Sequence, residues 1–181
     1  DESAAESLYQ GARSIFDEMG ADDYLVLTDR ARAELFGATG RYAEAAAVAR
    51  EALTRAAEVG EPVMALDHAA VLAEALLELG EHREALDVVH THLADHEVPV
   101  DSIDAARHQG VLAMTLLAND LKVEALATVD AALATSAAHN DPKLHARLYE
   151  LRWRARPQST EADRDLAHAV ALLREVPSSH D

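Results

Sequence analysis

Histidine is the residue type best suited to chemistry in this sequence, because imidazole titrates near neutral pH and binds transition metals. The chain contains ten histidines. His92 and His96 are four residues apart, a spacing that places two imidazoles on one helix face, where they can chelate one metal ion. His90 and Asp95 lie nearby, but no third ligand is evident on that face. His92 and His96 are therefore candidate metal ligands, and the alternative is a surface pair near a helix end, where the dipole favours protonated imidazole.

Motifs for other chemistry are absent from the sequence. The seven glycines form no G-x-x-x-x-G-K-[ST] or G-x-G-x-x-G run, and there is no G-x-S-x-G elbow. The chain has no cysteine, which excludes disulfides, thiol nucleophiles and cysteine-ligated metal sites. Carboxylates are dispersed and do not form a convergent pair. We therefore predict that the chain is not an enzyme and carries no cofactor.

The charge of the chain limits its partners. Its 16 Lys and Arg against 33 Asp and Glu give a net charge of −17 with neutral histidines. Nucleic-acid binding needs basic side chains that replace counterions, and no basic stripe is present. We therefore expect no direct contact with nucleic acid. The acidity fits either a solvated surface or a basic client.

Hydropathy indicates where the chain resides. No apolar run approaches the roughly 20 residues that a membrane span requires, and no signal peptide is recognisable. We expect a cytoplasmic protein without membrane contact. Because the sequence starts at Asp1 and not at methionine, we also expect a processed product or a segment of a longer protein.

The elements that would position any site come from an internal repeat. GRYAEA at 40–45 recurs as GEHREA at 80–85 and, weakened, as DLKVEA at 120–125, a spacing of 40 residues. Two further sets of residues keep this spacing. They are Ala33, Ala73 and Ala113, and Leu53, Leu93 and Leu133.

Within each repeat, apolar residues recur at three and four positions, which predicts two helices separated by a turn. Gly40 and Gly80 stand where a left-handed residue would end the first helix, and Asn119-Asp120 replaces the glycine in the third repeat. Pro62 suits a first helical turn, and Asp101 suits an N-cap. We predict one all-α domain over 1–181 with about nine helices. The predicted ranges are 3–19 for a lone first helix, then 21–38 and 41–59, 62–79 and 81–96, 101–118 and 121–138, and 142–155 and 159–176 divided at Pro157.

The predicted second helices of the repeats carry alanine at regular positions. Ala45, Ala49 and Ala52 would face both the partner helix and the next repeat, where small side chains let backbones approach. Ala85 and Ala125 occupy the position of Ala45. We expect leucine at any of these positions to overpack the interface and to cost about 1–3 kcal/mol.

These residues resemble the tetratricopeptide repeat (TPR). The resemblance covers residues 3–176 and departs from the family pattern in three ways: the tryptophan position of the first helix holds Asp29, Ala69 and Gln109, the closing proline is mostly absent, and the period is 40 and not 34. Longer units of this kind occur in the superhelical domains of large bacterial regulators, including the maltose-regulator type. The matching residues are Ala33, Gly40, Tyr42, Glu44, Ala45, Ala49 and Ala52, and then Leu72, Ala73, Gly80, Ala85 and Leu93.

The resemblance implies a right-handed α-solenoid of stacked antiparallel helix hairpins whose first helices line a concave, partner-binding face. By position, this face would be acidic in the middle and basic later, which could orient an extended client. The alternative is that these residues only solvate a helix face. The candidate partner-binding residues are Arg30, Glu34, Asp67, Glu74, Glu78, Arg107, Met114, Arg147, Leu151 and Arg154.

Two functions follow from the resemblance. The first is an interaction or scaffold module that binds a peptide or partner domain, as part of a larger bacterial regulatory protein. The second is a ligand- or peptide-sensing segment of a transcriptional regulator. Metal binding by the histidines is a third possibility.

The two ends of the predicted solenoid differ. The helix at 159–176 is rich in charged residues, so we expect it to be a solvated cap. The helix at 3–19 has an apolar stripe that could form a homodimer. The residues of that stripe are Leu8, Tyr9, Ile15, Phe16 and Met19.

Overall fold

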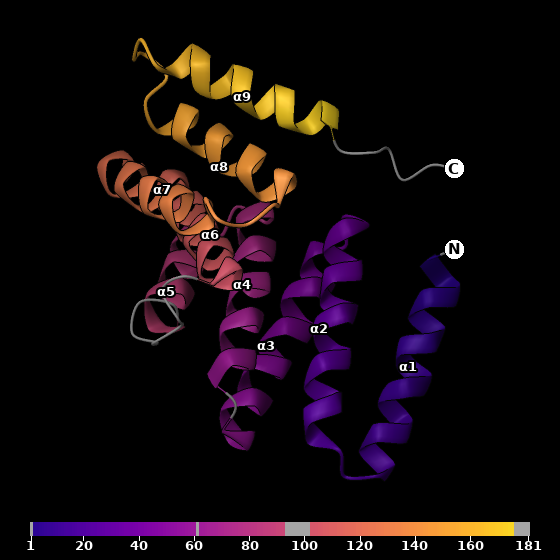
Figure 1. Ribbon diagram of the computed structural model, residues 1–181. Helices are drawn as coiled ribbons and strands as arrows, with labels where there is room; N and C mark the ends of the chain where they lie inside the picture. The colour runs from indigo at the N-terminus through magenta and orange to yellow at the C-terminus, as the bar shows by residue number, and fades with distance from the viewer. Residues whose placement is uncertain (1, 61, 93–101, 176–181) are drawn as a thin grey trace. The chain divides into compact units, whose positions relative to one another are not determined.

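The computed structural model describes residues 2–60, 62–92 and 102–175, and the regular elements in this part of the chain are nine α-helices (Figure 1). The all-α prediction is therefore confirmed. None of these helices is both long and apolar enough to cross a membrane. The helices are α1 (Glu2–Glu18), α2 (Asp22–Ala38), α3 (Tyr42–Val59), α4 (Pro62–Glu78), α5 (His82–His92), α6 (Ile103–Ala118), α7 (Lys122–Ser136), α8 (Pro142–Ala155) and α9 (Ala162–Glu175).

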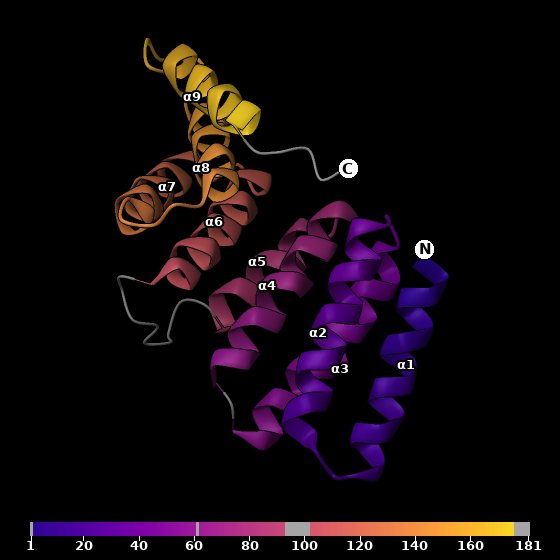
Figure 2. The same cartoon turned by 45° about the vertical axis from the view of Figure 1, so that its right-hand side comes forward.

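The chain divides into two compact units, residues 1–96 and residues 97–181. In unit 1, α2 packs against α1 and α3, and α4 packs against α3 and α5 (Figure 2). In unit 2, α7 packs against α6 and α8, and α8 packs against α9. Within each unit, each helix thus packs against its neighbours in sequence, as expected for hairpins α2–α3, α4–α5, α6–α7 and α8–α9. The single domain and the right-handed superhelix stay predictions.

The turns inside the first three hairpins share one backbone geometry. Gly40, Gly80 and Asp120 have φ angles of 77°, 80° and 61°, in the left-handed region. At Gly40 the amide donates to Gly37 O at 3.2 Å, and the following Arg41 amide donates to Phe36 O at 2.8 Å. This is the Schellman motif, which satisfies the last carbonyls of a helix. The same pair of bonds forms at Gly80 and at Asp120, so the predicted helix ends have a local physical cause.

Other helix ends differ from the sequence prediction. Asp101 and residues 93–96 lie outside the described residues. Ser102 caps α6, because its Oγ accepts a hydrogen bond from the Ala105 amide at 3.0 Å. The last helix begins at Ala162 and not at 159, since the turn after α8 extends through Pro157 to residue 161.

Small side chains form the contacts between helices, as predicted. Ala45, Ala49 and Ala52 of α3 are fully buried, and so are Ala85 and Ala125 at the equivalent position of later hairpins. In unit 2, larger apolar side chains complete one core cluster around the alanines. Its buried members are Ala106, Ala113, Val129, Ala132, Leu144, Leu148 and Leu151.

Exposed apolar side chains occur on both the first and the last helix. On α1, Leu8 is 74% exposed and Ile15 is also exposed, as is Met19 directly after the helix. Tyr9 and Phe16 are half-buried, and Phe16 stacks on Tyr24 of α2 with ring centroids 5.1 Å apart. The solvated cap at α9 stays a prediction, and beside its charged residues this helix also exposes apolar side chains at a helical spacing. These are Leu166, Val170 and Leu173.

Candidate functional site

The first helices of successive hairpins contact each other within each unit. In unit 1, α2 contacts α4, and in unit 2, α6 contacts α8. We use the term first-helix face for the sides of these four helices that carry the predicted partner-binding residues. Five of those residues belong to unit 1 and five to unit 2. The residues of each unit are therefore described separately.

In unit 1, the face is organised around Arg30. Its Nε donates to Glu34 Oε1 at 2.9 Å on the same helix, and its Nη1 forms a short ion pair with Asp67 of α4. Arg30 thereby joins two first helices through polar side chains. Glu74 is half-buried and Glu78 is exposed. The predicted residues in this unit are one arginine, which pairs with Glu34 and Asp67, and four carboxylates in all, so this part of the face is acidic.

In unit 2, the predicted basic residues Arg107 and Arg154 are paired with acids. Arg107 contacts Asp104 at 3.3 Å on its own helix and Asp141 at 3.0 Å at the start of α8. Arg154 lies 3.9 Å from Glu150. These carboxylates compensate part of the positive charge, which makes this part of the face less basic than its arginines alone indicate.

Asp141 also caps α8. Its Oδ1 accepts a hydrogen bond from the Leu144 amide at 3.0 Å. This backbone bond is the main cause that lowers the pKa of Asp141, and its hydrogen bond with Arg107 adds to the effect, against partial burial. Because Asp141 stays ionised, it both caps the helix and holds Arg107 across the α6–α8 contact.

Two other predicted residues of unit 2, Arg147 and Met114, contact each other. An Arg147 terminal nitrogen lies 2.6 Å from the Met114 sulfur, which joins α8 to α6. Met114 also packs against the core cluster of unit 2. Both helices of the pair are thus linked twice along the face, once by Arg107 and Asp141 and once by this contact.

Leu151 is a correction to the predicted site. It is only 1% exposed and belongs to the core of unit 2, so it cannot touch a partner on the surface. The equivalent positions of the other first helices hold Ala31, Val71 and Val111. Val111 is buried and Ala31 and Val71 are half-buried, so an apolar residue in every hairpin is the signal for a position turned away from solvent.

The candidate metal ligands receive no support from the structure. His92 is half-buried in the last turn of α5, and His96 lies outside the described residues. Across the described ranges, no group of three His, Cys, Asp or Glu side chains could hold a metal ion.

Unit 1 contains a buried ionic contact that the sequence patterns did not predict. Asp29 of α2 has a side chain only 3% exposed, and Arg13 of α1 donates from Nε to its Oδ1 at 2.9 Å. Arg55 of α3 lies on the other side, with its Nε 4.0 Å from Oδ2. Asp29 occupies the tryptophan position of the repeat pattern. One carboxylate therefore bridges three helices where the pattern expects an aromatic ring.

A second network joins three helices of unit 2. Asp165 of α9 is 3% exposed, and its carboxylate accepts from Arg152 at 2.6 Å and from Arg156 at 3.0 Å. Arg152 also reaches Asp130 of α7 at 3.2 Å. Burial would raise the pKa of Asp165, but its hydrogen bonds to Arg152 and Arg156 outweigh burial and lower it. Asp165 occupies the position of Ala45, Ala85 and Ala125, so the last hairpin replaces a small apolar contact by an ionic one.

No protein-family model and no curated protein matches the sequence. Solved structures do match the fold. BtubC (BKLC) from P. vanneervenii aligns with a TM-score of 0.76 and 19% identity over 99% of this chain and 75% of its own. A Podosopora anserina protein named as a kinesin light chain, with nearly identical TPR-like repeats, aligns at 0.64 and 16% over 96% of this chain and 94% of its own. The MamA RS-1 ArsTM double mutant aligns at 0.57 and 14% over 94% and 95%. The chain therefore has the fold of the TPR-like helical repeat proteins.

Proposed function

We propose that this chain is a protein-interaction or scaffold module whose first-helix face binds a peptide or a partner domain. The observation that carries the proposal is the contact of successive first helices, α2 with α4 and α6 with α8. Their paired polar side chains make a surface of defined geometry in each unit. Its fold is that of TPR-like structures, a fold that generally serves protein binding.

Charge supports a protein ligand over a nucleic acid. The net charge of −17 repels phosphate. On the face itself, unit 1 offers the exposed carboxylates of Glu34 and Glu78, while in unit 2 Arg107 and Arg154 are already paired with acids. A partner segment with basic residues opposite unit 1 would complement this pattern.

The cellular context belongs to the same proposal. The resemblance of the repeats to those in large bacterial regulators supports a place in a regulatory protein. A sensor segment of a transcriptional regulator differs in one measurable respect: a small ligand, and not a protein, would bind the face. The exposed apolar residues of α1, among them Leu8 and Ile15, support self-association through that helix.

Charge reversal on the face tests the proposal. The full chain serves as bait in a bacterial lysate, and the retained proteins are quantified by mass spectrometry. The first variant carries Glu34→Lys and Glu78→Lys, on α2 and α4. Its matched control carries Glu51→Lys and Glu58→Lys, on exposed positions of α3 with the same change in charge. We expect a saturable partner that the control retains and the face variant loses.

A second pair of charge-reversal variants tests the face of unit 2. Arg107, Arg147 and Arg154 are changed to Glu in one variant, and Lys122, Arg164 and Arg174, all on second helices, are changed to Glu in the other. Equal retention of the partner by the face variants and their controls would contradict binding on this face. Loss of all protein partners, together with a metabolite that raises the melting temperature, would favour the sensor function.

A further inference from the structure

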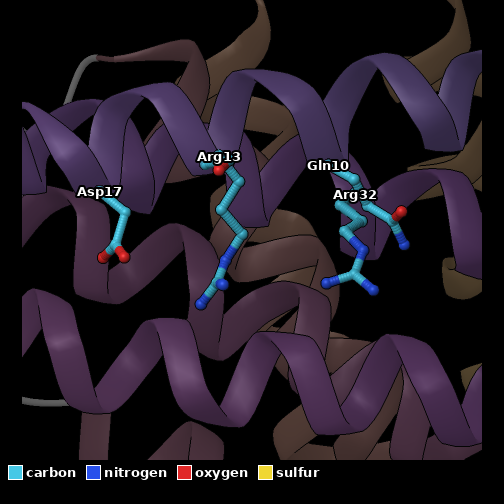
Figure 3. Close-up of a pocket in the computed structure, with 5 residues that line it drawn as sticks. Gln10, Arg13, Asp17 and Arg32 are labelled. Atoms are coloured by element: carbon cyan, nitrogen blue, oxygen red, sulfur yellow. The ribbon is translucent and has the colours of Figure 1, made fainter.

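Unit 1 contains a polar pocket that the first-helix face does not include. The pocket has a volume of about 350 Å³ and is lined by residues of α1 and one residue of α2 (Figure 3). On α2, Arg32 and Arg30 are two residues apart, which separates them by roughly 160° around the helix axis. The pocket therefore lies on a different side of α2 from the Arg30–Asp67 pair. Its lining residues are Gln10, Arg13, Ser14, Asp17 and Arg32.

Two guanidinium groups enter this pocket from different helices. Figure 3 shows the Arg13 and Arg32 side chains extending into the same space beside α1. Arg13 donates from its Nε to Asp29, and its two terminal nitrogens form no hydrogen bond to any described residue. Because Asp29 fixes the stem of Arg13, the terminal nitrogens are held in place to receive an acceptor.

Arg32 is held by packing and not by an acid. Its guanidinium carbon lies 5.1 Å from the centre of the Phe36 ring, a cation–π contact. It forms no ion pair with any residue that the structure describes, and its buried Nε has no hydrogen-bond partner there. The charge of Arg32 contributes to lowering the pKa of Glu44, but the Glu44 carboxylate is hydrogen-bonded to Arg41 and not to Arg32. The charge of Arg32 thus remains available to a ligand.

The neighbouring groups indicate the class of ligand. Gln10 and Ser14 supply neutral donors, and Asp17 is an exposed carboxylate at the pocket. Two terminal guanidiniums match the planar oxygens of one carboxylate. A phosphate dianion would meet stronger repulsion from Asp17 and from the acidic chain. We propose that this pocket binds the side-chain carboxylate of an Asp or Glu residue in an acidic protein segment, between Arg13 and Arg32.

The probe is N-acetyl-glutamic acid α-amide, which carries only the side-chain carboxylate. It is titrated into the ¹⁵N-labelled full chain, and two-dimensional NMR follows the backbone amides of α1 and α2 and the Arg Nε–Hε signals. The neutral N-acetyl-glutamine amide and sodium chloride at equal ionic strength are the blanks. We expect saturable shifts centred on Arg13 and Arg32 with the glutamate probe alone.

Three variants sharpen the test. Arg32→Gln should weaken the probe about tenfold, because one charged hydrogen-bonding partner is lost. The matched control Arg83→Gln removes an exposed arginine of α5 in the same unit and should leave affinity unchanged. Asp17→Asn should tighten binding by several-fold, since it removes the repelling carboxylate. If circular dichroism shows that Arg32→Gln is unfolded, Arg32→Lys replaces it and should still bind more weakly than the wild type.

The possible results separate the ligand sources and the two sites. If Arg32→Gln and Arg83→Gln changed the affinity for the probe equally, or if sodium chloride caused the same NMR shifts as the probe, the proposal that the pocket binds a carboxylate would be wrong. Inorganic phosphate or N-acetylglycine binding as tightly as the glutamate probe would overturn the assignment to a side-chain carboxylate. The variant with Glu34→Lys and Glu78→Lys should bind the glutamate probe as tightly as the wild type. A negative result for partner binding on the first-helix face would therefore not contradict the carboxylate pocket.

Discussion

At the scale of the residue, one buried position of the first helices holds four different side chains. Thr28, His68, His108 and Leu148 occupy equivalent places, and all four are buried. His68 is only 1% exposed, and burial lowers its pKa, with the nearby Arg30 acting in the same direction. Asp67, Asp29 and a hydrogen bond with the Val26 backbone oppose the shift. The net effect favours a neutral imidazole in the folded chain.

We predict that His68 makes the fold sensitive to mild acid. Below about pH 6.5, the unfolded chain binds a proton that buried His68 does not, so the free energy of unfolding falls as the pH decreases towards the lowered pKa. Above about pH 6.5 the residue contributes no pH dependence. Urea unfolding at about pH 7.5 and about pH 5.5 should show a smaller loss for His68→Gln than for wild type, by up to about 1.4 kcal/mol per pH unit. The exposed His90→Gln serves as control, and an equal loss in both variants would refute the prediction.

Substitutions in the ionic network around Asp165 should change the stability of the fold. Asp165→Ala restores the alanine of the earlier hairpins but leaves Arg152 and Arg156 without their buried partner, which we expect to cost about 3 kcal/mol. The position of Arg152 holds Leu72 and Leu112 in the second and third hairpins. Replacing a buried ion pair by matched apolar residues is often neutral.

The double variant Asp165→Ala, Arg152→Leu should therefore recover most of the stability that Asp165→Ala loses, measured by urea unfolding at neutral pH. A double variant no more stable than the single one would contradict this. Wild type should also lose stability as the pH falls below about 4, where the lowered pKa of Asp165 has its effect, and both variants should lose less.

At the scale of the element, the helix ends marked by glycine and the alanine contacts between helices were predictable, and the ionic contacts between helices were not. Gly40 and Gly80 predict helix ends because a left-handed residue is a local requirement. Pairs such as Arg30–Glu34 and Asp104–Arg107 are also local, and their spacing could have predicted them. The Arg30–Asp67 pair depends on two helices meeting, which no local pattern encodes. The same limit applies to Asp29, whose arginines come from two other helices.

Asp120 gives a prediction about the turn of the third hairpin. Its φ angle is 61°, a left-handed conformation that is strained for a residue with a Cβ atom but not for glycine. Asp120→Gly should raise the free energy of unfolding by about 1 kcal/mol, the lower end of the cost of a left-handed conformation. Gly80→Ala, at the equivalent turn, should lower it by about the same amount. Thermal unfolding of both variants would measure this, and a destabilised Asp120→Gly would show that the Asp120–Lys122 contact matters more.

At the scale of the whole molecule, two electrostatic effects oppose each other. The net charge of −17 produces repulsion that favours the expanded chain. Ion pairs such as Arg50–Glu84 favour the fold, but both of these side chains are about half exposed, and exposed pairs contribute little. Repulsion should therefore exceed the gain from the exposed pairs.

We predict that salt stabilises the chain. Raising sodium chloride from about 0.01 M to about 0.15 M shortens the Debye length from about 30 Å to about 8 Å. If screening of the repulsion is worth about 1 kcal/mol, the melting temperature should rise by about 2–4 °C for a chain of this size. Circular dichroism at fixed pH would measure it. A melting temperature that falls with salt would mean that the ion pairs contribute more than the repulsion.

The junction between α2 and α4 also bears on how such a chain can evolve. Arg30 meets Asp67 across this junction, whereas the residue equivalent to Asp67 in the next first helix is Arg107. If recombination joined the hairpin α2–α3 directly to α6–α7, Arg30 would face another arginine. The hairpin α4–α5 is therefore not a dispensable module, because its deletion would place the like charges of Arg30 and Arg107 against each other.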